Sequence, residues 1–330
     1  MTEFLKRAVC TNFITMLPYY HEAKNMDYYS NIKDYLVRNE INHRVKDYSK
    51  NRSDLDTYYN VGKMIVLAQG GETRAKYGDR LIKEYSERLT MELGRGYSTR
   101  NLKRMRNFYL IIQKGTPLVA QLSWSHYIIL MSLKDVNEIN YYINQVKERN
   151  LSKRELQQVI KNKEYERLDE SSKQKLIQNE KLELVETIKN PIIITNPTNK
   201  DIYKEKVLGD LIMEDLDNFL KELGTGYYYV GREYQIKEEN KIYKIDFLLY
   251  NVEFNSYIVI ELKIGELKHS HIGQLELYMN YIDKNQKKNY QNKTIGIILC
   301  KQDNKLVMKY CSNPNIITRE YILTEGDINV

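Results

Sequence analysis

The chain has 330 residues, with 51 Lys or Arg against 44 Asp or Glu and a net charge of +7. This length supports two domains with a sizeable core. The sequence contains no run of about 18 apolar residues, so it predicts no membrane-spanning helix. The mild positive charge permits a polyanionic partner without requiring one. The scattered cysteines, Cys10, Cys300 and Cys311, match no zinc spacing and no disulfide framework, so we expect a cytoplasmic protein without a membrane partner.

Residues 1–165 are predicted to be mainly helical, because apolar residues recur there at spacings of three and four. Gly94 and Gly96 are typical of a helix end, and Ser98 or Thr99 can cap the helix that follows. We therefore expect a helical N-terminal domain in this part of the chain.

A basic stretch, "YSTRNLKRMR", follows the glycine turn and contains no acidic residue. Its basic side chains are Arg100, Lys103, Arg104 and Arg106. They could bind phosphates near a helix N-terminus, which would make this a DNA-binding surface. The alternative is a solvated basic face of a packed helix. The stretch "KNQKKNYQNK" at 284–293 raises the same two alternatives.

Residues 166–200 change in composition and are predicted to form a charged linker or a solvated helix. Two Asn-Pro pairs in "NPIIITNPTN" indicate the entry to a second domain at 201–330. In that domain a helical pattern over 207–226 precedes strand patterns at 227–236, 241–250 and 257–264. A helical pattern at 271–284 and a strand at 294–300 follow. This order predicts an α/β domain with a mixed sheet, and an α+β fold overall.

Three charged residues interrupt the most apolar part of this domain, and they are Asp246, Glu261 and Lys263. If 245–250 and 257–263 form an antiparallel hairpin in which Tyr250 faces Tyr257, then Asp246 faces Glu261. Lys263 then lies on the same face of the sheet. A divalent cation would turn the repulsion between the carboxylates into chelation, and oxygen ligands suit Mg²⁺ or Mn²⁺. Such a site is equipped for phosphodiester hydrolysis. The alternative is a cross-strand salt bridge at an exposed edge, and a one-residue register slip would separate the carboxylates.

The string "DFLLY" followed by "YIVIELKIGELKHSHIGQLELYMNYID" resembles the PD-(D/E)xK nuclease superfamily, and specifically its YhcG-like branch. The strings "KYGDRLIKEYSERL", "GRGYSTRNLKRMRNFY" and "LSWSHY" look like the N-terminal domain of that family. The resemblance implies that this domain is a winged-helix-type DNA-binding module. It also implies that the C-terminal domain has a restriction-endonuclease-like fold.

The resemblance further implies roles for individual residues. Asp246, Glu261 and the backbone carbonyl of Leu262 would bind the metal, and Lys263 would be the catalytic lysine. Gln274 matches the helix glutamine of the family, and Tyr278 follows it as a supporting residue. Glu214 falls where the superfamily often places a helix acid. Ile245 occupies the place of the usual proline before the first aspartate.

Taken together, the residues and the resemblance predict a Mg²⁺-dependent deoxyribonuclease, with Mn²⁺ able to substitute. We expect it to be an endonuclease that cuts double-stranded DNA as a homo-oligomer, in defence against foreign DNA or in DNA processing. The alternative is a non-catalytic DNA-binding or scaffold subunit that retains a nuclease fold. An RNA substrate stays open at this point.

Overall fold

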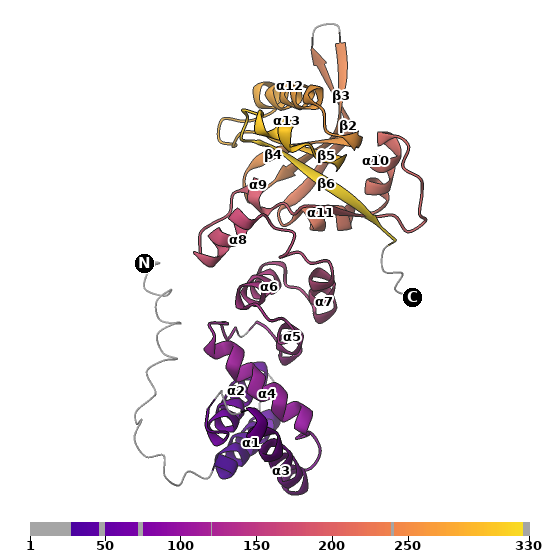
Figure 1. Cartoon of the computed structure of the whole chain (residues 1–330). Helices are drawn as coiled ribbons and strands as arrows, with labels where there is room; N and C mark the ends of the chain where they lie inside the picture. Colours follow the sequence, from indigo (N-terminus) through magenta and orange to yellow (C-terminus); the bar gives the residue numbers. More distant parts are fainter. Residues whose placement is uncertain (1–27, 46–49, 72–74, 120, 239–240, 326–330) are drawn as a thin grey trace. The chain divides into compact units, whose positions relative to one another are not determined.

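The computed structural model describes residues 28–45, 50–71, 75–119, 121–238 and 241–325 (Figure 1). The chain divides into two compact units, residues 1–140 and 141–330, which we describe separately. No helix in the described ranges is long and apolar enough to cross a membrane.

The first unit is helical wherever the structure describes it. Its helices are α1 (Tyr28–Val45), α2 (Lys50–Ala68), α3 (Ala75–Leu93), α4 (Thr99–Gln113), α5 (Trp124–Leu130) and the first residues of α6 (Val136–Arg149). This confirms the helical N-terminal region. Among its described residues the unit contains no strand, so the β wing of a winged helix is not seen there and that part of the expectation is not confirmed.

Helices α2 and α4 approach each other closely at Gly62. A Cβ atom added at Gly62 would lie only 2.1 Å from the backbone oxygen of Met105. Helix α4 begins where the sequence predicts, because the Ser98 side chain accepts a hydrogen bond from the backbone of Asn101. Its apolar stripe includes the buried Leu102 and Phe108, and its basic residues therefore lie off the packed face.

The second unit contains a six-stranded mixed sheet. Its helices are the rest of α6, α7 (Lys153–Lys161), α8 (Glu170–Ile177), α9 (Leu184–Thr187), α10 (Glu205–Glu214), α11 (Leu216–Leu223), α12 (His269–Asn285) and α13 (Lys305–Lys309). Its strands are β1 (Ile192–Thr195), β2 (Tyr227–Glu238), β3 (Lys241–Asn251), β4 (Ser256–Glu266), β5 (Ile295–Gln302) and β6 (Ile316–Thr324). They lie in the order β1-β6-β5-β4-β3-β2. Strands β2, β3 and β4 pair antiparallel and the remaining neighbours pair parallel, which confirms the mixed sheet and the α+β class.

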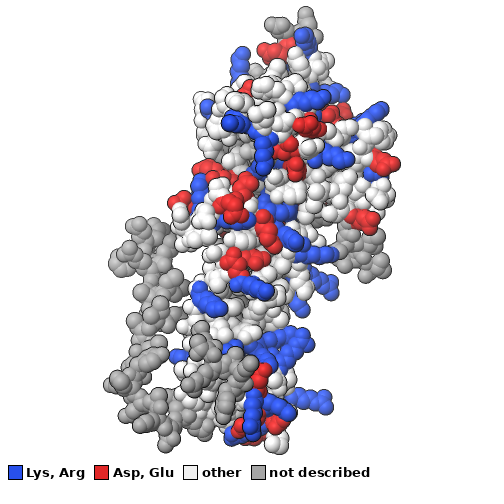
Figure 2. Space-filling view, viewed as in Figure 1, with Lys and Arg blue, Asp and Glu red and all other residues white. Residues whose placement is uncertain are grey.

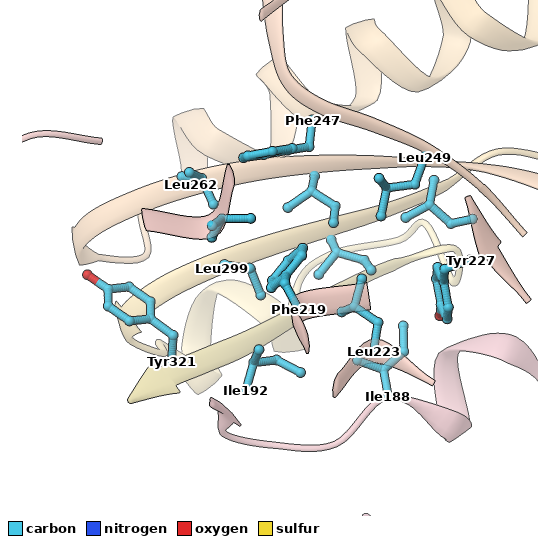
Figure 3. Close-up of a cluster of buried hydrophobic side chains, with 14 of the residues drawn as sticks. Ile188, Ile192, Phe219, Leu223, Tyr227, Phe247, Leu249, Leu262, Leu299 and Tyr321 are labelled. Atoms are coloured by element: carbon cyan, nitrogen blue, oxygen red, sulfur yellow. The ribbon is translucent and has the colours of Figure 1, made fainter. Parts of the chain in front are cut away.

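Helices cover both faces of this sheet (Figure 1). On one face, Phe219 and Leu223 of α11 pack with Phe247, Leu262 and Leu299 of the strands (Figure 3). On the other face, α12 packs against alternate strand residues through Ile272, Leu275, Met279 and Ile282. Along β4 and β5 the two clusters follow the two-residue period of the strands. In β3 this period is interrupted at Asp246, because Ile245 and Phe247 belong to opposite clusters.

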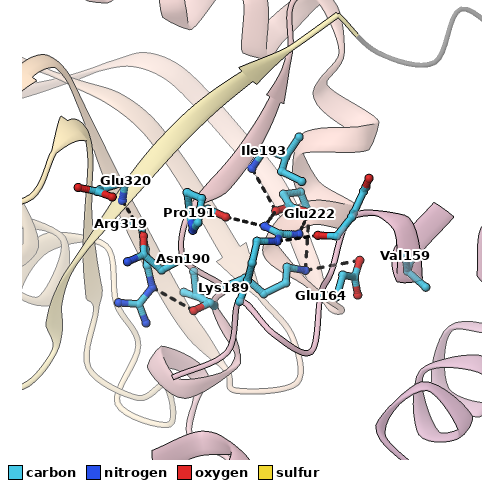
Figure 4. Close-up of polar contacts among 12 residues, drawn as sticks. Val159, Glu164, Lys189, Asn190, Pro191, Ile193, Glu222, Arg319 and Glu320 are labelled. Atoms are coloured by element: carbon cyan, nitrogen blue, oxygen red, sulfur yellow. Dashed lines mark hydrogen bonds and ion pairs between the residues drawn. The ribbon is translucent and has the colours of Figure 1, made fainter. Parts of the chain in front are cut away.

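Residues 166–200, expected as a linker or a solvated helix, contain α8, α9 and the edge strand β1. Most charged side chains of this segment are exposed or half-buried. Lys189 is the buried one, and it lies among carboxylates in the interior (Figure 4). Lys189 is 3% exposed, with its Nζ 3.8 Å from Oε1 of Glu164 and 3.9 Å from Oε2 of Glu222. Burial nevertheless lowers the pKa of Lys189.

Arginines complete this ion cluster. Arg167 pairs with Glu222, and Arg149 lies 2.8 Å from Glu164. The backbone N–H of Ile193 in β1 also donates to Glu222. The cluster therefore ties the segment after α6 to the edge of the sheet.

Candidate active site

Strands β3 and β4 bring the predicted carboxylates together. Phe247 pairs with Ile260 and Tyr250 with Tyr257, as the predicted register requires, but the ladder ends at Phe247 and does not include a pair between Asp246 and Glu261. Next to the Phe247–Ile260 pair, the Asp246 carboxylate accepts a hydrogen bond from the backbone N–H of Leu262 at 2.8 Å. The Leu262 side chain points into the core together with Phe247 (Figure 3).

Glu261 is the centre of a hydrogen-bonded group. Its Oε2 accepts from Nζ of Lys263 at 3.3 Å and from Nε2 of Gln274 at 3.2 Å. The same Gln274 nitrogen lies 2.9 Å from the hydroxyl of Tyr278. The structure thus brings together Asp246, Glu261, Lys263, Gln274 and Tyr278, from β3, β4 and α12.

The electrostatics of this group are set first by the burial of its carboxyl groups. Glu261 is only 2% exposed, and burial together with the nearby Asp246 raises its pKa to about 8. Burial also raises the pKa of Asp246. For Lys263, burial acts to lower the pKa, but Glu261, Glu205 and Asp246 outweigh it and the pKa rises. Lys263 is therefore held as an ammonium ion.

The oxygen atoms of the group fit a divalent cation. Oε1 of Glu261 is buried and has no hydrogen-bond partner among the described residues, which is costly unless something else satisfies it. No group of three or more His, Cys, Asp or Glu side chains in the described ranges is placed to hold a metal. The ligands that the resemblance implies are the carboxylates of Asp246 and Glu261 and the carbonyl of Leu262, and the structure joins Asp246 to the Leu262 backbone N–H. A Mg²⁺ ion is commonly held by one or two carboxylates and keeps several waters.

The acid that α10 contributes is Glu205. Its Oε1 lies 3.5 Å from Nζ of Lys263. The predicted helix acid, Glu214, forms an exposed ion pair with Lys200 at 2.7 Å instead. These two glutamates occupy opposite ends of α10, about 14 Å apart along the helix axis, and the structure brings only Glu205 to the group.

Arg232 of β2 adds a cation beside Asp246, and its charge acts to lower the pKa of that carboxyl. Its Nη2 lies 2.7 Å from Asp210 and donates to the backbone oxygen of Lys206 at 3.1 Å. A Cβ atom at Gly209 would lie 2.9 Å from this nitrogen, so the glycine leaves room for the guanidinium. The sequence analysis missed Glu205 and Arg232, because no spacing to the β3–β4 residues marks either of them.

Two family models match the chain. The YhcG PDDEXK nuclease domain matches residues 185–325, and the DUF1016 N-terminal domain matches residues 36–167. Residues 36–167 and 185–325 thus match the two domains of the YhcG-like family. Over 283 residues it is 29% identical to the Escherichia coli (strain K12) protein named "Putative nuclease YhcG", a match that covers 74% of this chain and 76% of that protein.

Solved structures give local matches to this YhcG-like chain. A repair endonuclease from Pyrococcus abyssi is 18% identical over 37% of this chain, with a TM-score of 0.26. EndoMS in its complex with dsDNA is 17% identical over 38% of this chain, with a TM-score of 0.28. Each match spans 48% of the solved chain, about half of its length. The family assignment therefore rests on the two domain models and the E. coli relative.

The basic residues predicted to bind DNA lie in the first unit of this YhcG-like chain. Lys103 forms an ion pair with Asp79 at 2.8 Å, and Arg106 donates to Gln69 at 2.6 Å. Arg104 makes a long hydrogen bond of 3.5 Å to Asn101, and Arg100 is exposed. Figure 2 shows acidic and basic side chains interspersed on the face in view. The net positive charge is therefore not gathered into one field on that face.

Proposed function

We propose that this chain is a metal-dependent endonuclease that hydrolyses phosphodiester bonds in DNA. One observation carries the proposal. Asp246, Glu261 and Lys263 converge in a chain of a nuclease family, and a buried oxygen of Glu261 has no hydrogen-bond partner among the described residues. A purely structural salt bridge would not need that unsatisfied oxygen.

The proposed metal ligands are the carboxylates of Asp246 and Glu261 and the backbone carbonyl of Leu262. We propose Mg²⁺, with Mn²⁺ able to substitute, because all of these ligands are hard oxygens. When bound, such a cation stabilises negative charge on a phosphate and makes a water more acidic.

Lys263 acts in this proposal as a fixed positive charge. Since three carboxylates keep its pKa high, it is a poor proton acceptor at neutral pH. Its ammonium is held between Glu261 and Glu205 at 3.3 Å and 3.5 Å. It can therefore orient the attacking water and offset the charge that develops on the phosphate. Gln274 positions Glu261, Tyr278 positions Gln274, and Glu205 takes the role that the sequence analysis gave to Glu214.

The substrate and the setting complete the proposal. We propose duplex DNA as the substrate, with a DNA contact in the first unit made by Arg100, Lys103, Arg104 and Arg106. A homo-oligomer would supply one active site for each strand. The free thiols of Cys300 and Cys311 agree with a cytoplasmic location. A role in defence against foreign DNA or in DNA processing rests on the family resemblance.

The experiment that tests this function is a cleavage assay with supercoiled plasmid and linear duplex, in Mg²⁺, Mn²⁺ or EDTA. Lys263→Ala is the matched variant. Metal-dependent cutting by the wild type alone would support the nuclease and the role of Lys263. Equal cutting by both proteins would point to a contaminant. Tight DNA binding without cutting by either would favour the scaffold alternative.

A further inference from the structure

The outer surface of α12 runs from the candidate active site to a lysine-rich loop. Gln274, which binds Glu261, begins a row of exposed side chains at helical spacing that continues through Leu277, Asn280 and Lys284. The row contains no acid. Two acids of α12 lie beside the row. Asp283 accepts hydrogen bonds from Thr294, and Glu276, one helical turn before Asn280, is half-buried.

The basic loop, residues 284–293, is rich in unpaired positive charge. It holds Lys284, Lys287, Lys288 and Lys293, of which all but Lys287 are exposed. Lys287 donates to the backbone oxygens of Lys288 and Gln291. Within the described ranges none of the four forms an ion pair. By contrast, Lys103 of the first unit is paired with Asp79.

The backbone of the basic loop is held by the turn between β3 and β4. Gln291 accepts from the N–H of Lys288 at 2.8 Å and donates to the Tyr250 hydroxyl at 3.0 Å. Asn255 donates to the backbone oxygen of Tyr290 at 2.7 Å. These bonds fix the chain that carries the lysines, so less conformational entropy is lost when they bind an anion.

The spacing between the loop and the site suits a nucleic-acid strand. Lys284 is ten positions after Gln274 on α12, which corresponds to about 15 Å along the helix axis. Phosphates follow one another every 3.4 Å or so along each strand of a duplex, so this length corresponds to roughly four or five of them. None of the four residues of the row is acidic, and of the two acids beside it Asp283 is engaged by Thr294.

We propose that a DNA duplex lies along the outer face of α12, with the basic loop binding phosphates about four or five nucleotides from the phosphate in the active site. This inference rests on the proposed nuclease function. Lysines act here as point charges, so the contact contributes affinity and alignment without reading sequence.

The first test removes three exposed charges of the loop. The triple variant Lys284→Gln, Lys288→Gln and Lys293→Gln leaves Lys287 in place. The matched control removes three exposed lysines elsewhere in the second unit, Lys147→Gln, Lys153→Gln and Lys305→Gln. Binding of the full-length proteins to a 30-base-pair duplex is measured in EDTA over a range of KCl concentrations. Each lost phosphate contact lowers the magnitude of the slope of log affinity against log salt concentration by about 0.9. We therefore expect the magnitude of this slope to be smaller by about 2 to 3 in the loop variant, and to be the same as the wild type in the control.

The second test places a carboxylate on the α12 row. Leu277 is 41% exposed, and Leu277→Glu should weaken duplex binding about tenfold at low salt, with a smaller effect at high salt. Ile177 of α8 is 44% exposed, and Ile177→Glu is the control for an added charge on a helix outside the cluster that α12 packs into. Equal effects of the two substitutions would count against the path along α12.

The outcomes separate this inference from the proposed function. Equal loss of slope in both triple variants, or no loss in the loop variant, would overturn the loop contact, even if the wild type cuts DNA in Mg²⁺. If the wild type does not cut but the loop variant alone loses slope, the nuclease proposal fails and the DNA contact stands. Melting curves of all variants establish that each is folded.

Discussion

Asp246 of β3 accepts a hydrogen bond from the backbone N–H of Leu262 on β4 at 2.8 Å. A side chain thereby takes the hydrogen bond that a neighbouring strand would otherwise accept. The bond also holds the Asp246 carboxylate against β4, where its charge acts on Glu261. The geometry of β3 and β4 thus brings proposed ligands together. A substitution of Asp246 by asparagine would remove the charge of this side chain and keep its shape.

Asp246→Asn should abolish metal-dependent cutting while the fold is retained. The amide oxygen can still accept from Leu262, but the negative charge that attracts a cation is gone. A protein that binds metal melts at a higher temperature in its presence. We therefore expect Mg²⁺ to raise the melting temperature of the wild type and not that of the variant. Equal stabilisation of both proteins would show that the metal binds elsewhere.

Gln274→Ala should lower the rate of cutting more than Tyr278→Phe. The alanine removes the amide that donates to Glu261, whereas the phenylalanine removes only the hydroxyl that contacts Gln274. We expect roughly fivefold and twofold losses, in line with about 1 kcal/mol for a hydrogen bond and less for one made indirectly. Single-turnover cleavage at saturating protein measures both. The reverse order would mean that Tyr278 acts directly on the substrate.

Gly209→Ala should impair activity with little effect on stability. The added methyl meets the flexible end of Arg232, which can move away from Asp246. Alanine is also favoured over glycine within a helix by about 1 kcal/mol. Cleavage rates and urea unfolding of Gly209→Ala and Arg232→Gln form the test. If Gly209→Ala cuts as fast as the wild type, the position of Arg232 does not matter for activity.

The stability of the first unit should fall as the pH rises from about 10 to about 12, in part through Tyr127. This residue is buried, and burial raises its pKa from 10.0 to about 12. Between these values the folded state keeps a proton that the unfolded state loses, so the stabilisation is complete below pH 10 and is lost as pH passes 12.

The matched variant for this pH effect is Tyr127→Phe. It loses the hydrogen bonds to Pro117 and Val119, so it should be less stable than the wild type at pH 8 by about 1 to 3 kcal/mol. The difference in the free energy of unfolding should narrow by pH 11.5, as urea titrations at several pH values would show. If the difference in the free energy of unfolding between the two proteins does not change with pH, the loss of stability at high pH comes from groups other than Tyr127.

The sequence predicted the centre of the second unit well, because its strands alternate and Tyr250 pairs with Tyr257 as expected. The predicted pair of Asp246 with Glu261 is not formed, since the Asp246 side chain accepts a hydrogen bond from the backbone of Leu262 instead. The sequence did not reveal β1 and β6, the strands farthest from the β3–β4 hairpin. The four residues of β1 are too short for a periodic pattern, and β6 carries Arg319 and Glu320 in its middle. Arg319 is buried because Asp169 and the backbone oxygens of Ile188 and Val185 satisfy it.

The choice between Glu205 and Glu214 shows a similar limit. Both lie on one helix, and local pattern favours neither. The selection depends on which end of α10 reaches β4, and that is a tertiary contact between elements about 50 residues apart. In the structure the N-terminal end of α10 reaches β4, and the Lys263 ammonium lies beside Glu205.

The buried ion cluster has a consequence for how this protein can be divided. Lys189 and Glu222 lie within the matched nuclease domain, residues 185–325, whereas Glu164, Arg167 and Arg149 precede it. A fragment cut at residue 185 would leave Lys189 and Glu222 without these counter-charges, at a cost of several kcal/mol. Residues 185–325 therefore depend on charged side chains that precede them in the chain. A chimera that exchanges the N-terminal region should keep the native chain from about residue 141 onward.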